Sequence, residues 1–269
     1  RYFCEDHATG PGGRKLMRIW WTLVRRELGT YFVSWTGYVV IAVVLFLFGL
    51  SFSMLLHVMN GSEADKPLTE MLYEKLSIFL WLILLLASPV ITMRTFAHEK
   101  FSGTFETLMT TQVSDLQVVL AKFSGALAFY LLMWSPLVAC LFIVRHFTND
   151  PTTVDPGTLG STFLGIILLG SVYMSIGCFA SALTRSQIVA AMIALALGIT
   201  LYLLSFISSV LTGQDNWALK IFTHIDLMEH MRDFARGVVD VRPLVFYVST
   251  TGLFLFLTLK SVESRRWKS

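Results

Sequence analysis

Charged residues are scarce in this sequence. Only 14% of its 269 residues are Asp, Glu, Lys or Arg, whereas 55% are apolar, and the mean hydropathy is +0.66. Soluble domains carry roughly 25% charged residues, so this chain has too few charges to cover a water-facing surface. Its net charge of +3 is small and scattered, which argues against a nucleic-acid partner. We therefore predict an integral membrane protein.

Motifs for catalysis, nucleotide binding and metal binding are also missing. Cys4, Cys140 and Cys178 have no CxxC spacing and are too few for a disulfide framework. The glycine-rich stretch at 10–15 lacks the spacing of a phosphate loop, no HExxH or GxSxG occurs, and the six histidines show no ligand spacing. A membrane-embedded enzyme or stand-alone channel would need such a cluster or conductance without ATP, so we rank that class last. We expect no catalytic, cofactor-binding or metal-binding residue in this chain.

Six apolar stretches are long enough to cross a bilayer, which takes about 20 residues. They lie at 37–58, 76–93, 123–144, 159–183, 187–211 and 243–260. None has a charged residue away from its ends, so an ion relay across the membrane has no evident carrier. The fourth stretch has small residues at Ser171, Ser175, Gly177 and Ser181, which favours close helix packing within the chain or across a dimer.

Basic residues divide unevenly between the two faces that six spans define. The face with both termini holds 14 Lys and Arg residues and the other face holds 7, while acidic residues divide as 7 and 11. Loops rich in Lys and Arg stay on the cytoplasmic side. We therefore predict that both termini are cytoplasmic, including a basic tail at 262–269.

The N-terminal region divides into a polar and an amphipathic part. Residues 1–16 are expected to be a disordered extension, with no visible secretory signal peptide. Residues 17–34 carry apolar side chains at helical spacing, with Arg25, Arg26 and Glu27 placed largely on the opposite side. This pattern predicts a helix in the membrane interface. Its role is either simple anchoring or gating.

The loop after the second span, residues 94–122, predicts a short cytoplasmic helix. Gly103 and Thr104 interrupt the helical pattern, and residues 105–109 then form a short apolar stripe. Ser114 is a good N-cap for the next helix. A short helix between two long ones could receive a push from a cytoplasmic partner. If periodicity were the only evidence, an inert connecting loop would be favoured.

A second polar segment, residues 212–242, precedes the last span on the outer side. Its apolar residues alternate with charged ones at helical spacing, and the segment is too polar to cross the membrane. We predict one or two amphipathic helices that lie on the outer leaflet or cap the outer end of the bundle. Gly237 is a plausible helix stop.

Residues 94–108 read RTFAHEKFSGTFETL and resemble the signature of ABC-2 type exporter permeases. In that family an acidic residue, a Gly-Thr step and a second Glu before Leu mark the coupling helix that meets the ATPase. The resemblance extends over nearly all of residues 17–267. It includes Arg25 to Leu28 in the elbow helix, Ala121-Lys122 at the start of the third span, and two segments, 233–240 and 259–267, that look like the gliding-motility and copper-enzyme-maturation branch. Many relatives have Gly where this chain has Ala121, a departure expected to affect packing more than coupling.

The resemblance implies an all-α integral membrane fold like that of type V exporters, with a six-span permease domain at 37–261. It also implies a homodimer of permeases in the plasma (inner) membrane of a prokaryote, and two separate ABC ATPase subunits that bind ATP and Mg. The residues to which it assigns roles are Arg94, Glu99, Gly103, Thr104, Glu106 and Leu108 for ATPase coupling, Arg25, Arg26 and Glu27 in the elbow helix, and Phe234, Arg236 and Gly237 in the outer gate helix.

Two alternatives stay open. Glu99 and Glu106 either pair with basic residues of the ATPase or cap their own helix ends. The complex either exports a solute or acts mechanically on an extracytoplasmic accessory protein without moving a solute. The uncharged spans select no substrate.

Overall fold

The computed structural model describes residues 11–59, 68–103, 114–140, 156–210 and 225–266. These residues form helices and contain no strand. The helices are α1 (Pro11–Val33), α2 (Trp35–Met59), α3 (Leu68–Thr92), α4 (Ala97–Ser102), α6 (Asp115–Met133), α8 (Pro156–Leu183), α9 (Gln187–Val210), α11 (Leu227–Ala235) and α12 (Val241–Arg266). Six helical segments of the described residues are long and apolar enough to cross a membrane. The predicted all-α, six-span fold is confirmed.

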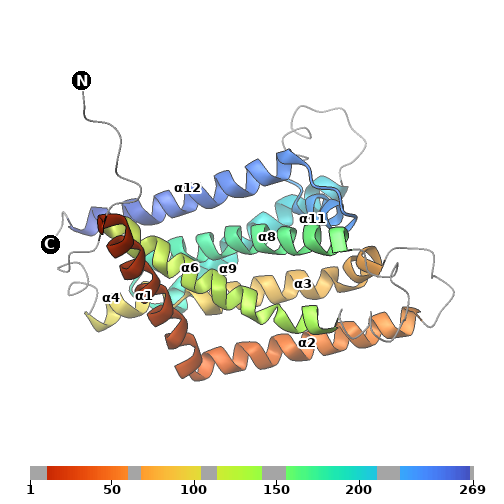
Figure 1. The fold of residues 1–269 in the computed structure, drawn as a ribbon, viewed down its shortest axis with the longest axis horizontal. Helices are drawn as coiled ribbons and strands as arrows, with labels where there is room; N and C mark the ends of the chain where they lie inside the picture. Colours follow the sequence, from red (N-terminus) through yellow and green to blue (C-terminus); the bar gives the residue numbers. More distant parts are fainter. Residues whose placement is uncertain (1–10, 60–67, 104–113, 141–155, 211–224, 267–269) are drawn as a thin grey trace.

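The long helices run side by side, and the short ones lie at their ends (Figure 1). α1 crosses one end of the bundle, where it packs on α6 and contacts α4 through Arg26 and Glu99. α11 lies at the opposite end and packs on α8. An even number of spans brings α1 and the end of α12 to the same side, as the sequence predicts.

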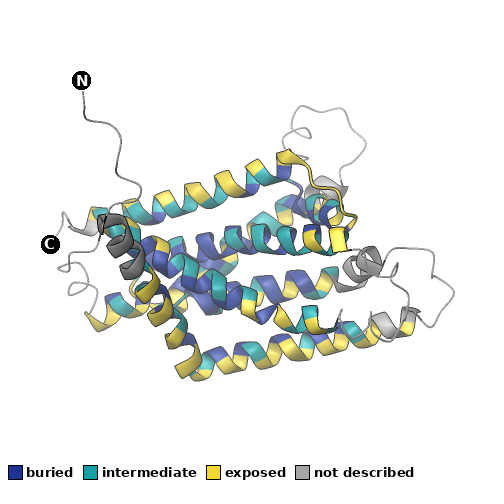
Figure 2. Cartoon of the chain, in the orientation of Figure 1, coloured by how far each residue is buried: buried dark blue, intermediate teal, exposed yellow. Residues whose placement is uncertain are grey.

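α8 is the most buried of the six spans. In its most apolar window 67% of the residues are buried inside the bundle, against 22% for α2 and 17% for α12. Figure 2 shows the same division, with buried residues concentrated in the middle helices and exposed ones along α2 and α12. The exposed residues of α2 and α12 include many large apolar side chains, as expected where helices face lipid tails.

The small residues of α8 allow close helix packing, as predicted. Gly177 faces Thr92 of α3, and a Cβ at position 177 would lie 2.6 Å from the Cβ of Thr92. Ser171 lies 3.2 Å from the hydroxyl of Thr251 on α12. These contacts are made within one chain, which is the first of the two alternatives left open by the sequence.

Two predicted helix boundaries are confirmed by their hydrogen bonds. Ser114 caps α6, since its side chain accepts from the N–H of Gln117 while the Gln117 side chain accepts from the N–H of Ser114. Gly237 ends α11 with φ +87°, and Val238 N donates to Asp233 O at 2.9 Å. A left-handed residue followed by such a bond is the Schellman ending, which favours glycine.

Two boundaries differ from the prediction. α1 begins at Pro11, so residues 11–16 belong to the first helix and not to a disordered extension. Proline is well accepted in the first turn of a helix, because the N–H that it lacks would have no partner there. The short helix predicted after the second span lies at Ala97–Ser102, before Gly103, whose φ of +74° ends it. The apolar stripe predicted at 105–109 is outside the described residues.

Candidate functional site

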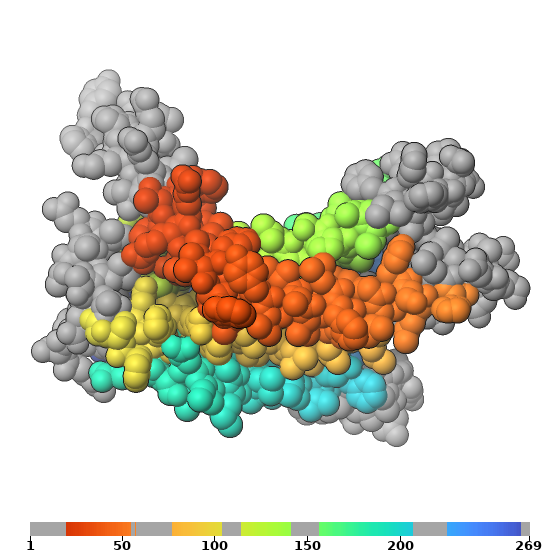
Figure 3. Space-filling model, turned by 90° about the horizontal axis from the view of Figure 1, so that it is seen from below, coloured from red at the N-terminus to blue at the C-terminus, as the bar shows by residue number. Residues whose placement is uncertain are grey.

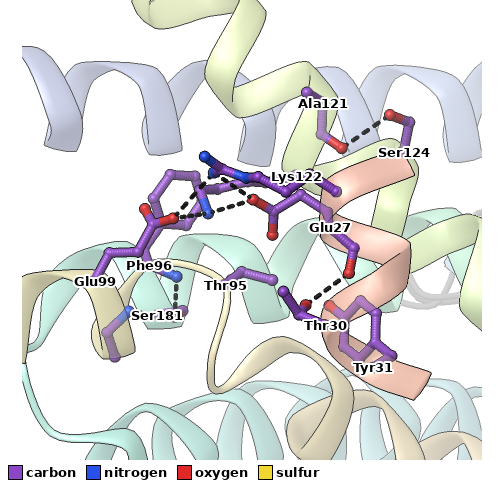
Figure 4. Close-up of polar contacts among 12 residues, drawn as sticks. Glu27, Thr30, Tyr31, Thr95, Phe96, Glu99, Ala121, Lys122, Ser124 and Ser181 are labelled. Carbon is purple, nitrogen blue, oxygen red and sulfur yellow. Dashed lines mark hydrogen bonds and ion pairs between the residues drawn. The ribbon is translucent and has the colours of Figure 1, made fainter. Parts of the chain in front are cut away.

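Four side chains from three helices meet where α1, α4 and α6 converge. Lys122 of α6 lies between two carboxylates, with its Nζ 2.7 Å from Glu99 Oε1 of α4 and 3.1 Å from Glu27 Oε1 of α1. Arg26 Nη2 lies 3.1 Å from Glu27 Oε1 and 3.5 Å from Glu99 Oε1. We call Arg26, Glu27, Glu99 and Lys122 the Lys122 cluster; Figure 4 shows its two carboxylates pointing toward Lys122.

Burial makes this cluster more than a surface ion pair. The side chain of Lys122 is 2% exposed and those of Glu27 and Glu99 are 10% and 18% exposed, whereas Arg26 is half exposed. Lys122 Nζ also lies 5.5 Å from the centre of the Phe96 ring, a favourable place for a cation. Because charges in a low dielectric interact strongly, each partner is needed to offset the others' loss of water. The cluster therefore ties α1, α4 and α6 together.

A second set of bonds ties α4 to the end of α8. Ser181 Oγ accepts hydrogen bonds from Phe96 N at 3.1 Å and from Ala97 N at 3.0 Å. These are the first N–H groups of α4, which has no capping side chain of its own. Lys100 Nζ donates to the carbonyl oxygen of Ala182, which also accepts from Ser261 Oγ of α12 at 3.2 Å. The short helix is thus held by the last turn of α8.

Replacing Ser181 with alanine tests this second attachment. Two buried N–H groups would lose their acceptor, and we expect a loss of about 1–2 kcal/mol of stability, as for other lost caps. Ser175→Ala is the matched control, because Ser175 is equally buried on α8 but donates only within its own helix, to Val172 O at 2.7 Å. Unfolding of the detergent-purified chain measures both variants. Equal losses in the two variants would contradict the capping role.

The corner between α1 and α2 lies beside the Lys122 cluster and is held by contacts of its own. Tyr31 stacks on Phe129 with ring centres 4.7 Å apart, and its hydroxyl donates to Ile91 O at 3.2 Å. Burial, with smaller contributions from Cys178 and Glu27, raises the pKa of this hydroxyl well above its usual value, so it stays a donor. A Cβ at Gly37 would overlap the carbonyl group of Tyr31. Glycine is therefore needed for the close turn into α2.

The residues predicted for coupling and for the elbow helix do not all lie in one place. Glu27 and Glu99 meet in the Lys122 cluster with Arg26, while Arg25 is exposed and Gly103 ends α4. Arg94 donates to the Ser34 hydroxyl beside the cluster. Thr104, Glu106 and Leu108 are outside the described residues.

The placement of Glu27 on the polar side of α1 is wrong. Glu27 is 8% exposed because it faces α6 and pairs with Lys122. It comes three residues after Val24 and four before Tyr31, which are both buried, so helical spacing puts it on the apolar face. A carboxylate on that face could have signalled a buried cation. Lys122 was noted only as a family match, and its pairing with Glu27 and Glu99 was not predicted.

The residues predicted for the outer gate lie at the opposite end of the bundle. Phe234 is buried against Gly165 of α8, and its carbonyl oxygen accepts from Ser161 Oγ at 2.7 Å. Arg236 and Gly237 are exposed beyond the end of α11. α11 thus caps this end of the bundle, one of the two places predicted for it.

Within the described part of the chain, no group of three or more His, Cys, Asp or Glu side chains could hold a metal ion. The arrangement provides instead a short helix bonded to three longer ones, in a bundle of six apolar helices. These features define a polytopic helical membrane protein.

The family model described as ABC-2 family transporter protein matches residues 59–228, more than half of the chain. The chain therefore belongs to the ABC-2 transporter family and is a membrane permease component of an ABC system. Among curated proteins, none matches the chain.

Proposed function

We propose that this chain is the permease subunit of an ABC-2 exporter and is driven by a separate ATPase chain. Two copies of the permease form the translocation path, and two ATPase subunits, which bind ATP and Mg, dock at the end that carries α1 and α4. The observation that supports this most directly is the bonding of α4 to α1, α6 and α8. A displacement of α4 would therefore also displace α1, α6 and α8.

The ATPase contact follows α4 in the chain. Gly103 ends the helix and leads into the segment with Thr104, Glu106 and Leu108, which would receive the motion of the ATPase. Arg94 and Glu99 then act within the permease, because Arg94 bonds the turn between α1 and α2 and Glu99 bonds α6. Arg25 is exposed beside the cluster, where the elbow helix could meet the ATPase or lipid headgroups.

α8 could carry the motion across the membrane. Its 28 residues span about 42 Å at 1.5 Å per residue. Its last turn holds α4 through Ser181, and its first turns hold α11 through Ser161 and Gly165. A tilt or shift of this one helix would move the outer helix, with Phe234, Arg236 and Gly237, when the inner end is displaced.

The orientation and membrane are part of the same proposal. The face with both termini holds 14 of the 21 Lys and Arg residues, which supports a cytoplasmic position for the α1–α4 end. The membrane would be the inner membrane of a prokaryote. The motifs at 233–240 and 259–267 support the gliding-motility and copper-enzyme-maturation branch.

Substituting the segment after α4 tests the coupling. With the permease and its ATPase reconstituted together, Glu106→Ala and Gly103→Val should reduce ATP hydrolysis to the rate of the ATPase alone. Both variants should still insert in the membrane and pair. Glu263→Ala is the control, because Glu263 is an exposed acid on the last turns of α12 whose ion pair in the described structure is a surface contact with Lys260. A chain that hydrolyses ATP by itself, or that purifies as a monomer and never retains an ATPase, would contradict the proposal.

The burial of α11 also favours a second candidate function. A helix fixed to α8 at the outer end could transmit the stroke to an extracytoplasmic accessory protein without solute export. Reconstituted vesicles distinguish the two functions. Solute movement that depends on ATP supports the exporter, whereas ATP-dependent binding or release of an outer partner without solute movement supports the mechanical role.

A further inference from the structure

The corner between α1 and α2 borders a cavity that reaches the Lys122 cluster. It has a volume of about 700 Å³ and is bounded by α1, α2, α4, α6 and the end of α3. Arg94, Glu99 and Ser34 are among the groups that line it, together with the apolar side chains of Val90 and Phe129. A cavity of this size, with a few polar groups among apolar ones, is typical of a small-ligand site.

An apolar groove continues from this cavity along the membrane-facing side of α2 and α3. The groove has a volume of about 340 Å³ and shares Thr36, Val40 and Val90 with the cavity. Beyond these shared residues its lining is apolar apart from the indole N–H of Trp35, and it includes Val43 and Leu86. Figure 3 shows the face where α2 and α3 lie side by side. The cavity, with its few polar groups, thus continues into an apolar groove along two membrane-spanning helices.

Two charged side chains of the cavity have an incomplete set of partners among the described residues: Arg94 has no ion pair, and Glu99 Oε2 has no hydrogen-bond donor. Arg94 is half-buried and bonds Ser34, but no carboxylate among the described residues forms an ion pair with it. Glu99 accepts from Lys122 through Oε1, while its Oε2 is buried with no hydrogen-bond donor in the described structure. The cavity therefore offers a cation that can take a phosphate and an acceptor that can take an ammonium group.

We propose that this cavity and groove hold one phospholipid of the surrounding leaflet, with an ethanolamine headgroup. Arg94 binds the phosphate, Glu99 Oε2 accepts from the primary ammonium, and one acyl chain lies in the α2–α3 groove. Pockets with basic residues between membrane helices bind lipid headgroups in this way. The lipid fills the corner below the Lys122 cluster as a resident component.

The headgroup decides which lipid is selected. The acyl chain in the groove helps to hold the lipid but does not distinguish one phospholipid from another, because the same acyl chains occur with every headgroup. A choline headgroup has the same net charge but no N–H to donate to Glu99 Oε2, and a glycerol headgroup brings no cation. Both should bind less well than ethanolamine.

Lipid retention on the full chain tests this inference, and it does not depend on the ATPase. The chain is reconstituted into vesicles with equal amounts of phosphatidylethanolamine, phosphatidylcholine and phosphatidylglycerol that carry the same acyl chains. It is then extracted in mild detergent and its bound lipids are counted by native mass spectrometry. We expect one retained phosphatidylethanolamine per chain, about ten-fold preferred over the other two, as for a charge-assisted hydrogen bond.

Variants separate the headgroup contact from the groove. Arg94→Gln should lower retention about ten-fold, and Arg94→Lys, which keeps the cation, should restore part of it. Val43→Trp should block the groove and also lower retention. Val248→Trp is the matched control, because Val248 is an exposed apolar residue of α12 outside the groove. Circular dichroism of each variant confirms that it is folded.

Three results would overturn the inference. The first is equal retention of the three lipids. The second is unchanged retention in folded Val43→Trp, or displacement of the lipid by soluble phosphoethanolamine as effectively as by the whole lipid, which would leave the groove without a role. The third is efficient cross-linking between cysteines placed at position 43 in two chains, which would show that a second copy covers the groove.

Discussion

Replacing Lys122 with methionine is expected to destabilise the chain by about 3 kcal/mol. Methionine keeps a similar length but leaves Glu27 and Glu99 facing each other with only the half-exposed Arg26 to neutralise them. Removing one partner of a buried ion pair is costly, because the remaining charges have lost their water without gaining a counter-charge. Equilibrium unfolding of the detergent-purified chain measures the loss.

A surface pair on the same chain provides the control. Lys260 and Glu263 are 2.7 Å apart with exposures of 56% and 37%, so Lys260→Met should cost less than about 0.5 kcal/mol. Adding Glu27→Gln and Glu99→Gln to Lys122→Met should recover much of the loss, since the triple variant leaves no unpaired buried charge. A loss in Lys122→Met as small as in Lys260→Met would show that the cluster does not hold α1, α4 and α6 together.

The span count and the local helix ends could be read from the sequence because each depends on neighbouring residues. Six uninterrupted apolar stretches suffice to predict six membrane helices. Ser114 and Gly237 act on N–H and carbonyl groups within a few residues of themselves, so their roles follow from residue type and position. The start of α1 was predicted too late, because the polar residues before position 17 were assigned to a disordered extension, whereas Pro11 suits the first turn of a helix.

The central contacts could not be read in this way, because they join residues far apart in the chain. Lys122 lies 95 residues from Glu27 and 23 from Glu99, and Ser181 lies 85 residues from Phe96. No local period encodes such pairs. From the sequence, Glu99 was expected to pair with the ATPase or to cap its own helix end, whereas its partner Lys122 lies on α6. The contact with the ATPase stays a prediction.

The close contact between α3 and α8 could also be predicted only in part, because small residues indicate close packing but not the partner helix. Small residues along α8 indicate that some neighbour comes near, but they do not say which glycine is needed. Gly160 and Gly177 are both in α8, yet a Cβ would meet nothing within 4 Å at position 160 and would overlap Thr92 at position 177. The difference arises from where α3 lies against α8.

Alanine at position 177 should therefore destabilise the chain. The new Cβ would lie 2.6 Å from Thr92 Cβ and 2.8 Å from its Cγ2, and still closer to its Oγ1. Thr92 has no exposed surface and its hydroxyl bonds Ser88 O at 2.7 Å, so it has little room to turn away. Overpacking of this kind costs roughly 1–3 kcal/mol or more. It would exceed the gain of about 1 kcal/mol that alanine brings to a helix.

Gly160→Ala measures that gain alone, since it adds the same methyl group to the same helix in open space. It should leave the chain as stable as before or more stable by up to about 1 kcal/mol. The difference between the two variants in equilibrium unfolding then isolates the contact between α3 and α8. If Gly177→Ala were as stable as Gly160→Ala, α3 and α8 would be able to separate without loss. α8 would then not be held firmly enough against α3 to carry a displacement from α4 to α11.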